Sequence, residues 1–392
     1  MTQDVFILSA RRTPIGAFQG ALAPLSAPQL GAIAAQAAIK DANVSGDSLD
    51  EAIFGCVLSA GLGQAPARQA ALGAQVPQRV PATTINKMCG SGMKAIMLGS
   101  DQLRAGSAQL VLAGGLESMT NAPYLLPKAR AGLRMGHAEL LDHMFFDGLQ
   151  NPYDKQLMGY FADATAKKYA FTREQQDAYA AESVRRALAA VEAGAFEQEI
   201  AAATVKDRKG ERVISKDETP FTCDIAKIPT LKPAFNKDGT VTAASSSSIS
   251  DGAAALVLAS SDAVRTHQLK PIARIAGYAS FAQAPEWFTT APVGAIKSVM
   301  EKTGWKLDQI DLFEVNEAFA CVAMAAIHDL RLDPAKVNIN GGACALGHPI
   351  GATGARIVTT LIHSLKRTGG KRGIAALCIG GGEGTALALE VL

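Results

Sequence analysis

Residues 86–118 read NKMCGSGMKAIMLGSDQLRAGSAQLVLAGGLES, and this stretch contains the basic structural unit of the chain. A glycine-rich turn comes first, a helical pattern covers 91–105, and an apolar run at 110–113 leads into Gly-Gly-x-Glu. A short apolar run beside a helix is typical of a buried strand in a layered α/β fold. The stretch therefore predicts a tight turn, a helix and a strand in that order.

The same order of features returns near the C-terminus. DLFEVNEAFA at 311–320 is followed by NINGGACALGHPIGATG at 338–354, which opens a second helical pattern, and then by IAALCIGGGEGT at 374–385. An internal duplication is the simplest interpretation. Two similar α/β units packed against each other would bring both glycine-rich turns to their shared boundary, where functional sites form preferentially.

The remaining pattern fits an alternation of strands and helices. Strands are predicted at 5–8, 51–58, 110–113, 255–259, 273–278, 312–314, 337–339 and 374–378. Helices are predicted at 28–41, 91–105, 173–193, 293–302, 318–330 and 354–367. The segment 119–249 differs, because about 26% of its residues are charged against about 15% elsewhere. Such a polar segment is expected to run over the surface, outside the main core.

Composition narrows the class of protein. Of 392 residues, 48% are hydrophobic and 19% charged, which argues against disorder. The formal net charge of +2 without a dense basic block argues against nucleic-acid binding. The six cysteines form no C-x-x-C pair, as expected of free thiols in a reducing compartment. With no targeting segment and no membrane-spanning apolar run, a soluble cytoplasmic protein is expected.

Cys89 and His348 are the leading candidates for chemistry. Cys89 precedes the helix of the first unit, where the partial positive charge of a helix N-terminus stabilises a thiolate. His348 lies in the corresponding turn of the second unit, next to Pro349. A buried structural cysteine and an ordinary hydrogen-bonding histidine are the alternative interpretations. The run around His348 matches neither a Walker loop nor G-x-G-x-x-G, so it does not predict a nucleotide site.

Cys378 and Asn316 are weaker candidates. Cys378 ends an apolar run before three glycines, whose exposed N–H groups would suit an oxyanion hole. A bulge or a packing turn would use the same glycines. Asn316 could hold a water or a substrate oxygen, and it could equally cap the helix that follows.

His137 and His143 are the only clustered histidines, with Glu139 and Asp142 nearby. Their spacing matches no zinc motif, so a solvated face is the expected role of these side chains. The sequence implies no metal.

The motifs NKMCGSG, VNEAFA, NGGACALGHPIGATGAR and CIGGGEGTA together resemble those of the thiolases, specifically the acetyl-CoA acetyltransferases. The resemblance begins at RTPIGAFQG, residues 12–20, and covers essentially the whole chain. It implies a duplicated αβαβα layered core with an inserted loop domain. The division would be 1–118 plus 250–272 for the first half, 119–249 for the loop domain and 273–392 for the second half. A homotetramer without metal or prosthetic group is also implied.

The resemblance further implies reversible Claisen condensation of two acetyl-CoA to acetoacetyl-CoA and CoA. Cys89 matches the nucleophile, and His348 the histidine that activates it and donates to the thioester oxygen. Cys378 matches the acid/base that takes a proton from the acetyl methyl group. Asn316 matches the residue that orients a water in one oxyanion hole, and the N–H groups of Cys89 and Gly380 match the second hole. A thiolate suits the covalent step because it is both nucleophile and leaving group.

The charged middle segment resembles the loop domain that covers the active site and holds CoA. Ser247 matches the serine that contacts the pantetheine arm. The positions that match apolar walls of the substrate site are Leu149, Met158, Phe235, Ala318 and Phe319. Lys227 and Lys232 are the nearest basic candidates for the 3′-phosphate.

The chain departs from the family pattern in three places. Leu157 stands where many thiolases have a histidine. The segment AASSSSISDG departs from the pattern because it places serines at 245, 248 and 250. Phe288 and Thr289 stand where a Met-Gly pair often lines the acyl pocket, which predicts a pocket restricted to short chains.

Three functions are compatible with this resemblance. The first is a short-chain acetoacetyl-CoA thiolase, and the second is a 3-ketoacyl-CoA thiolase of β-oxidation that acts on longer chains. The third is a thiolase-fold protein that binds acyl-CoA or lipid without catalysis, which is disfavoured because all four catalytic positions are intact. A ketosynthase is disfavoured because those enzymes use histidines where this chain has Asn316 and Cys378.

Overall fold

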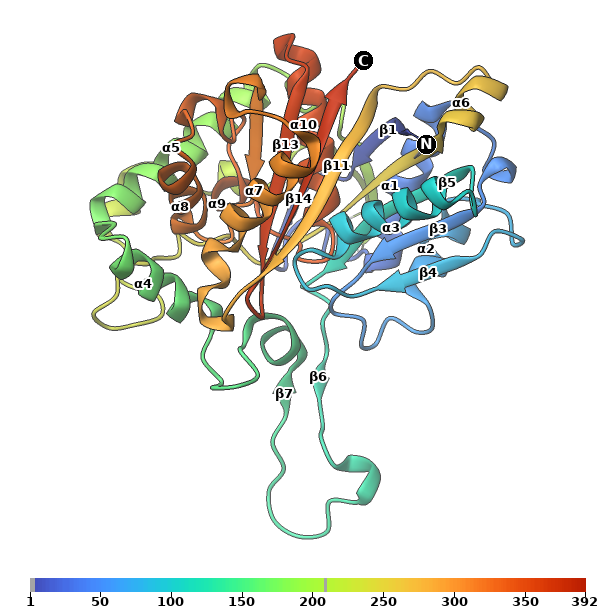
Figure 1. Ribbon diagram of the computed structural model, residues 1–392. Helices are drawn as coiled ribbons and strands as arrows, with labels where there is room; N and C mark the ends of the chain where they lie inside the picture. The colour runs from blue at the N-terminus through green and yellow to red at the C-terminus, as the bar shows by residue number, and fades with distance from the viewer. Residues whose placement is uncertain (1–3, 208–209) are drawn as a thin grey trace.

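The computed structural model describes residues 4–207 and 210–392, and one mixed sheet dominates that part of the chain (Figure 1). Its ten strands run in the order β12-β13-β14-β11-β1-β10-β5-β3-β4, with β2 paired to β10. The strands are β1 (Val5–Arg12), β2 (Gly16–Ala17), β3 (Glu51–Gly55), β4 (Ala82–Ile85), β5 (Leu110–Ser118), β10 (Ser250–Ser260), β11 (Ala273–Ala282), β12 (Leu312–Val315), β13 (Arg372–Ile379) and β14 (Glu383–Val391). The two halves meet where β1 runs antiparallel to β11, with Val5 opposite Ile275.

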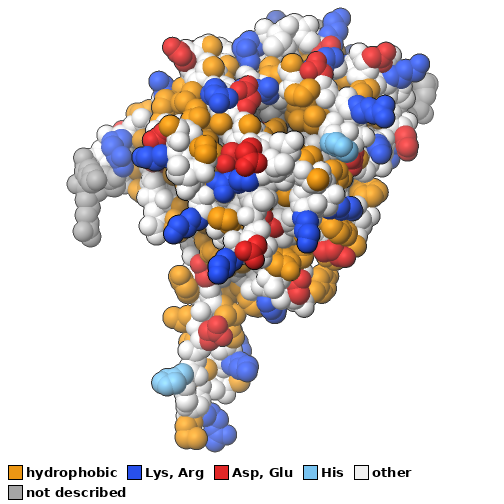
Figure 2. Space-filling view, turned by 90° about the vertical axis from the view of Figure 1, so that its left-hand side faces the viewer, with side chains coloured by type: hydrophobic (Ala, Val, Ile, Leu, Met, Phe, Trp, Pro, Cys, Tyr) orange, Lys and Arg blue, Asp and Glu red, His pale blue; other side chains and the backbone are white. Residues whose placement is uncertain are grey.

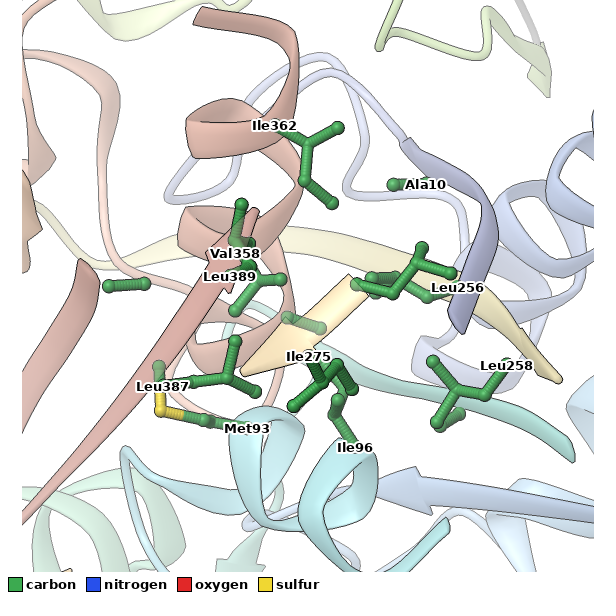
Figure 3. Packing of buried hydrophobic residues seen from close by; sticks show 14 of the residues in the cluster. Ala10, Met93, Ile96, Leu256, Leu258, Ile275, Val358, Ile362, Leu387 and Leu389 are labelled. Atoms are coloured by element: carbon green, nitrogen blue, oxygen red, sulfur yellow. The ribbon is translucent and has the colours of Figure 1, made fainter. Parts of the chain in front are cut away.

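Helices sandwich each half of the sheet. They are α1 (Ala27–Ala42), α2 (Pro66–Gly73), α3 (Ser91–Ala105), α6 (Ser261–Thr266), α7 (Ala291–Thr303), α8 (Ala320–Leu330), α9 (Ala343–Leu346) and α10 (Thr353–Thr368). Helices α1 and α2 share a core with the first half, and α7 and α8 share one with the second. A third core places α3 and α10 between strands of both halves (Figure 3). This arrangement confirms the predicted duplicated αβαβα core.

Two glycines let α3 and α10 cross closely at the centre. A Cβ at Gly92 would lie 2.7 Å from the backbone nitrogen of Ala355, and one at Gly354 would lie 2.3 Å from that of Met93. Any side chain at either position would force the helices apart, because packed interiors leave no such space. The close crossing brings the turn before α3 next to the turn before α10.

The segment between β5 and β10 carries the inserted elements. They are the strands β6 (Tyr124–Leu125), β7 (Leu141–Asp142), β8 (Ala203–Asp207) and β9 (Gly210–Ile214), and the helices α4 (Met158–Lys168) and α5 (Arg173–Glu192). The strands β6 and β7 form the base of an arm that projects from the body (Figure 1). The division of the whole chain into three domains stays a prediction.

Short helical turns complete the described chain. Those of 3₁₀ type are Gly46–Ser48, Ala129–Ala131, Thr219–Phe221, Ile225–Thr230, Pro285–Thr290, Leu307–Gln309 and Pro334–Lys336, and Met144–Leu149 is a π-helical turn. In residues 4–207 and 210–392, no helix has the length and apolar character needed to cross a bilayer.

A buried ion-pair network ties the inserted segment to the sheet. The guanidinium of Arg12, at the end of β1, contacts Glu199 at 2.6 Å and Asp217 at 2.7 Å. All three side chains are almost completely buried. Separating the insertion from the sheet would leave these charges buried without a partner, which costs free energy. The ion pairs therefore hold the insertion firmly against the first half.

Most predicted elements are present, and the helix predicted over 91–105 has the bounds of α3. The strand predicted at 337–339 is wrong. Val337 forms only an isolated parallel bridge to Phe313. Beyond it Asn338 has a left-handed φ of 49°, and its side chain pairs with both backbone groups of Val315, so the strand does not continue. Strands β4 and β14 were not among the predicted strands. The alanine-rich β14 is extended because it pairs with β11 on one side and β13 on the other.

Candidate active site

Cys89 lies in a tight turn immediately before α3. Met88 has a left-handed φ of 47°, and its N–H donates to the side chain of Asn86 at 2.8 Å. The hydroxyl of Ser91 accepts from the backbone N–H of Lys87 at 2.8 Å and donates to the carbonyl of Met88 at 2.6 Å. A non-glycine residue at positive φ is uncommon, and this local network holds it in place. The turn fixes where the sulfur of Cys89 points.

The backbone N–H groups of Gly380 and of Cys89 itself are placed to stabilise negative charge at the Cys89 sulfur. They are the two donors that the family resemblance assigns to an oxyanion hole, an assignment that stays a prediction. Burial raises the pKa of the Cys89 thiol to about 11, although both N–H groups favour the thiolate, and the nearby Glu117 carboxylate raises it further. Desolvation therefore outweighs the two backbone donors at the sulfur, and the stabilising effect of the helix N-terminus on a thiolate stays a prediction.

His348 lies in the turn that precedes α10, and it is buried. Its backbone N–H donates to the carbonyl of Ser248 at 3.2 Å and lies 3.3 Å from the hydroxyl of Ser250, so the serine-rich segment supports the turn. Burial, reinforced by the Arg356 cation, lowers the pKa of His348 to about 3. The imidazole is neutral at physiological pH and can accept a proton.

Asn316 follows β12 and faces the imidazole of His348. Its Nδ2 lies 3.5 Å from the Nε2 of His348, a long contact. The capping alternative is wrong, because α8 begins at Ala320 with Phe319 as its N-cap residue. The Oδ1 of Asn316 is buried and has no hydrogen-bond partner within the described residues. A buried polar atom without a partner is costly, so this oxygen is well suited to pair with a water or a substrate group.

Cys378 lies near the end of β13 and is buried within an apolar cluster. The cluster also contains Met158, Phe161, Phe171, Val241, Phe288, Ala318, Phe319, Cys321 and Val322. Burial raises the pKa of the Cys378 thiol well above its usual range, and the charge of Cys89 raises it further. A Cβ at Gly90, next to Cys89, would lie 2.5 Å from the side chain of Ile379, next to Cys378, so the fold brings the two cysteines near each other.

The predicted apolar walls lie around these groups. Leu149 packs in a cluster that includes Cys89, and Met158 borders Gly380, whose Cβ position lies 3.6 Å from the Met158 sulfur. The ring of Phe235 stands edge-on to that of Phe319, with centroids 5.9 Å apart. Ala318 and Phe319 contribute directly to the cluster around Cys378.

Two predicted CoA contacts differ in their surroundings. The backbone N–H of Ser247 donates to the carbonyl of Ala318 at 3.0 Å, which joins the serine-rich segment to the cluster around Cys378. Lys227 lies on the surface in the turn Ile225–Thr230 and pairs with Asp224 at 3.2 Å. The structure does not bring Lys227 into contact with the cluster, and its role stays a prediction.

Glu117 and Glu383 support the site, and neither was predicted to do so. Glu117 accepts from the backbone N–H groups of Val57 and Leu58, in its own half, and of Gly351, in the turn of His348. Burial raises the pKa of Glu117 to about 7. Glu383, in the second half, forms an ion pair with Lys87, two residues before Cys89. The sequence contained a signal for them, because each is the glutamate of one copy of the repeated Gly-Gly-x-Glu.

Glu317 was also missed, and it holds the turn that carries Asn316. Its buried carboxylate accepts from the hydroxyl of Ser183 at 2.7 Å, the side chain of Asn338 at 2.9 Å and the hydroxyl of Tyr179 at 3.0 Å. A charge buried this deeply requires such partners. Helix α5 of the inserted segment therefore contributes directly to the position of Asn316.

The histidine cluster of the inserted segment has a structural role at one position. His137 and Glu139 are exposed, as predicted for a solvated face. His143 is buried, so the prediction is wrong there. Its Nδ1 lies 2.6 Å from Asp147, and its Nε2 accepts from the backbone N–H of Ala60 at 3.3 Å.

Comparison with known proteins identifies the family. Residues 5–262 match the model of the thiolase N-terminal domain, and residues 269–391 match that of the thiolase C-terminal domain. The chain belongs to the thiolase family. This thiolase is 49% identical over 389 residues to the acetyl-CoA acetyltransferase of Pseudomonas aeruginosa, covering 99% of each chain.

Solved thiolase structures superpose on the whole chain. The acetyl-CoA acetyltransferase of Bacillus anthracis matches with a TM-score of 0.97 at 43% identity, covering 100% of this chain and 99% of the other. The Acat5 thiolase of Ascaris suum, solved in complex with coenzyme A, matches with a TM-score of 0.94 at 46% identity, covering 100% of both chains. The similarity therefore includes the turns that carry Cys89 and His348 and the end of β13 that carries Cys378.

Proposed function

We propose that this thiolase is an acetyl-CoA C-acetyltransferase, which condenses two acetyl-CoA to acetoacetyl-CoA and CoA and catalyses the reverse cleavage. One observation carries the proposal: turns from both halves of the fold bring Cys89, His348, Asn316 and Cys378 into one site, with the N–H of Gly380 at the sulfur of Cys89. The names of its relatives and the coenzyme A complex of one of them agree with CoA thioesters as substrates.

The first half-reaction transfers an acetyl group to Cys89. As the sulfur attacks the thioester carbon, its proton passes to the Nε2 of neutral His348, and a new C–S bond forms. The carbon–sulfur bond to CoA then breaks, and the departing CoA thiolate takes the proton of Cys378. Burial favours the protonated form of both Cys89 and Cys378 at rest. In this sequence of steps the proton of Cys89 goes to His348, and the proton of Cys378 goes to the departing CoA thiolate.

The second half-reaction forms the carbon–carbon bond. The Cys378 thiolate removes a proton from the methyl group of a second acetyl-CoA, and the resulting carbanion attacks the acetyl group on Cys89. The surroundings that raise the pKa of Cys378 also make its thiolate a strong base, which a weak carbon acid requires. Cys89 leaves and recovers its proton from His348. Every step uses side chains and backbone groups, so the proposed cycle requires no metal or prosthetic group.

The length of the acyl chain that the enzyme accepts tests the proposed substrate. Phe288 is buried in the same apolar cluster as Cys378 and stands edge-on to Phe161, so it limits the space beside the acyl group. Each methylene that a rigid pocket cannot accommodate costs about 1–3 kcal/mol. We expect kcat/KM for cleavage of acetoacetyl-CoA to exceed that for 3-oxohexanoyl-CoA at least tenfold. Phe288→Ala should narrow this ratio by favouring the longer substrate, as measured by steady-state kinetics with CoA.

Phe313→Ala is the matched control, because Phe313 is equally buried but lies in the core of the second half. It should lose stability without altering the substrate ratio. An unchanged ratio in folded Phe288→Ala would contradict the pocket assignment. Preference of the native protein for 3-oxohexanoyl-CoA would instead support a 3-ketoacyl-CoA thiolase of β-oxidation, and failure to cleave either compound would support a non-catalytic binder.

We also propose a homotetramer in which the inserted segment contributes contacts between subunits. The arm from Tyr124 to Asp142 carries apolar side chains that are unusually exposed for a monomer, among them Leu133, Leu140 and Met135, the last 99% exposed. Figure 2 shows hydrophobic and charged side chains side by side along this arm. Exposed apolar patches of this kind mark interaction surfaces. Light scattering at micromolar concentration should give a multiple of the 40.7 kDa chain mass, and a monomer would contradict the proposal.

For the compartment we propose the cytoplasm. The six cysteines are free thiols, which agrees with a reducing environment.

A further inference from the structure

A threonine hydroxyl lies against the imidazole of His348, on the side opposite Asn316. The Oγ1 of Thr353, the first residue of α10, is 2.6 Å from the Nδ1 of His348. The same oxygen lies 2.9 Å from the carbonyl oxygen of Pro349. Thr353 is completely buried, so its hydroxyl is restricted to these two neighbours in the described structure.

The chemistry of the proposed reaction explains why a hydroxyl suits this position. Nε2 can take the proton of Cys89 only when the neutral ring carries its own proton on Nδ1, so Nδ1–H must donate both before and after the transfer. A hydroxyl can accept from Nδ1–H while it donates its own hydrogen to another group.

We propose that Thr353 is a positioning residue whose hydroxyl accepts from Nδ1–H of His348 and so keeps Nε2 free to take the proton of Cys89, an inference that rests on the proposed function. The hydroxyl hydrogen of Thr353 donates to the Pro349 carbonyl, which leaves its oxygen free to accept. The carbonyl of Pro349 also accepts from the N–H groups of Ala352 and Thr353, so it does not depend on the hydroxyl.

The competing interpretation is that the Thr353 hydroxyl serves only the helix. It would then simply donate to a backbone carbonyl of the preceding turn, a hydrogen bond that threonines commonly make in helices. Thr359 provides a matched control for it. This residue lies on the same helix, is equally buried, and its hydroxyl donates to the carbonyl of Ala355, four residues earlier, at 3.0 Å. Among the described residues its hydroxyl makes no hydrogen bond to the imidazole, so Thr359→Val removes the helical bond alone.

The test measures the single-turnover rate at which acetyl-CoA acetylates Cys89 in Thr353→Val, Thr353→Ser and Thr359→Val. Because hydrogen bonds to charged groups are the stronger ones, we expect Thr353→Val to slow acetylation by about 10- to 100-fold, with KM for acetyl-CoA within about twofold of the native value. Thr353→Ser should recover most of the rate, and Thr359→Val should keep it. If the valine variant does not fold, Thr353→Ala provides the same comparison.

Two results would overturn the inference: Thr353→Val acetylating as fast as Thr359→Val, or Thr353→Ser as slow as Thr353→Val. Either would show that the hydroxyl serves the helix and not the imidazole. Failure of the native protein to acetylate Cys89 would instead contradict the proposed function, so the two failures are distinguishable.

Discussion

Replacement of Cys89 by alanine is expected to abolish both cleavage and condensation, with a loss of at least about 10⁴-fold in kcat, because no other group can form the acyl intermediate. The native protein incubated with acetyl-CoA should gain one acetyl group on Cys89. Two backbone N–H groups are placed to stabilise negative charge at its sulfur, and it lies in the turn beside that of His348. Intact-protein mass followed by peptide mapping measures the label.

Cys223 serves as the control for this experiment. It is a half-buried thiol on the inserted segment, and burial raises its pKa as well. Cys223→Ala should acetylate normally at Cys89. Label on Cys223 or on any other cysteine of the native protein, or no label at all, would defeat the assignment of the nucleophile.

Replacement of Cys378 by alanine is expected to separate the two half-reactions. Acetylation of Cys89 should persist, because His348 and the N–H groups at the sulfur remain in place. Condensation should fall by roughly 10²–10⁴, the usual effect of removing a general base, because the second acetyl-CoA keeps its methyl proton. Acetyl-enzyme formation by mass and acetoacetyl-CoA formation by absorbance measure the two halves separately.

Cys321→Ala controls for the cavity that this substitution creates. Cys321 is equally buried in the same apolar cluster, and its thiol lies 3.7 Å from the carbonyl of Ala162. A cavity of the same size should therefore form near Cys378 without removing the base. Normal condensation by Cys378→Ala, or an equal loss in both variants, would show that Cys378 is structural.

Local sequence patterns were sufficient for many of the elements of this thiolase and marked the turns that carry its candidate reactive groups. The helix over 91–105 is predicted with its observed bounds, because its periodicity and the glycines around it are local signals. The residues proposed for catalysis lie in turns that glycine-rich motifs mark in the sequence. Patterns failed where partners far along the chain decide the conformation. Strand β14 is extended because of two neighbouring strands, and residues 337–339 are not a strand because the Asn338 side chain occupies the backbone groups of Val315.

The charge state of the site could not be predicted from the sequence. The helix N-terminus suggested a thiolate at Cys89, but burial raises the pKa of that thiol to about 11 and lowers the pKa of His348 to about 3. Both shifts depend on how much of the surrounding protein excludes water, and no local pattern reports this. Burial therefore favours the neutral forms of Cys89 and His348, so a proton must leave Cys89 before it reacts as a thiolate.

The sequence by itself determined the duplicated order of strand, turn and helix, which follows from spacing within a few residues that a linear pattern records. It also carried the motifs whose resemblance to the thiolases points to Cys89, His348, Asn316 and Cys378. The tertiary structure alone decided that Gly92 and Gly354 let α3 and α10 cross, and that Glu117 binds the turn of His348 across 234 positions. Contacts between distant segments and the desolvation they cause arise only when both halves pack together, which is the physical reason that the site needed the fold.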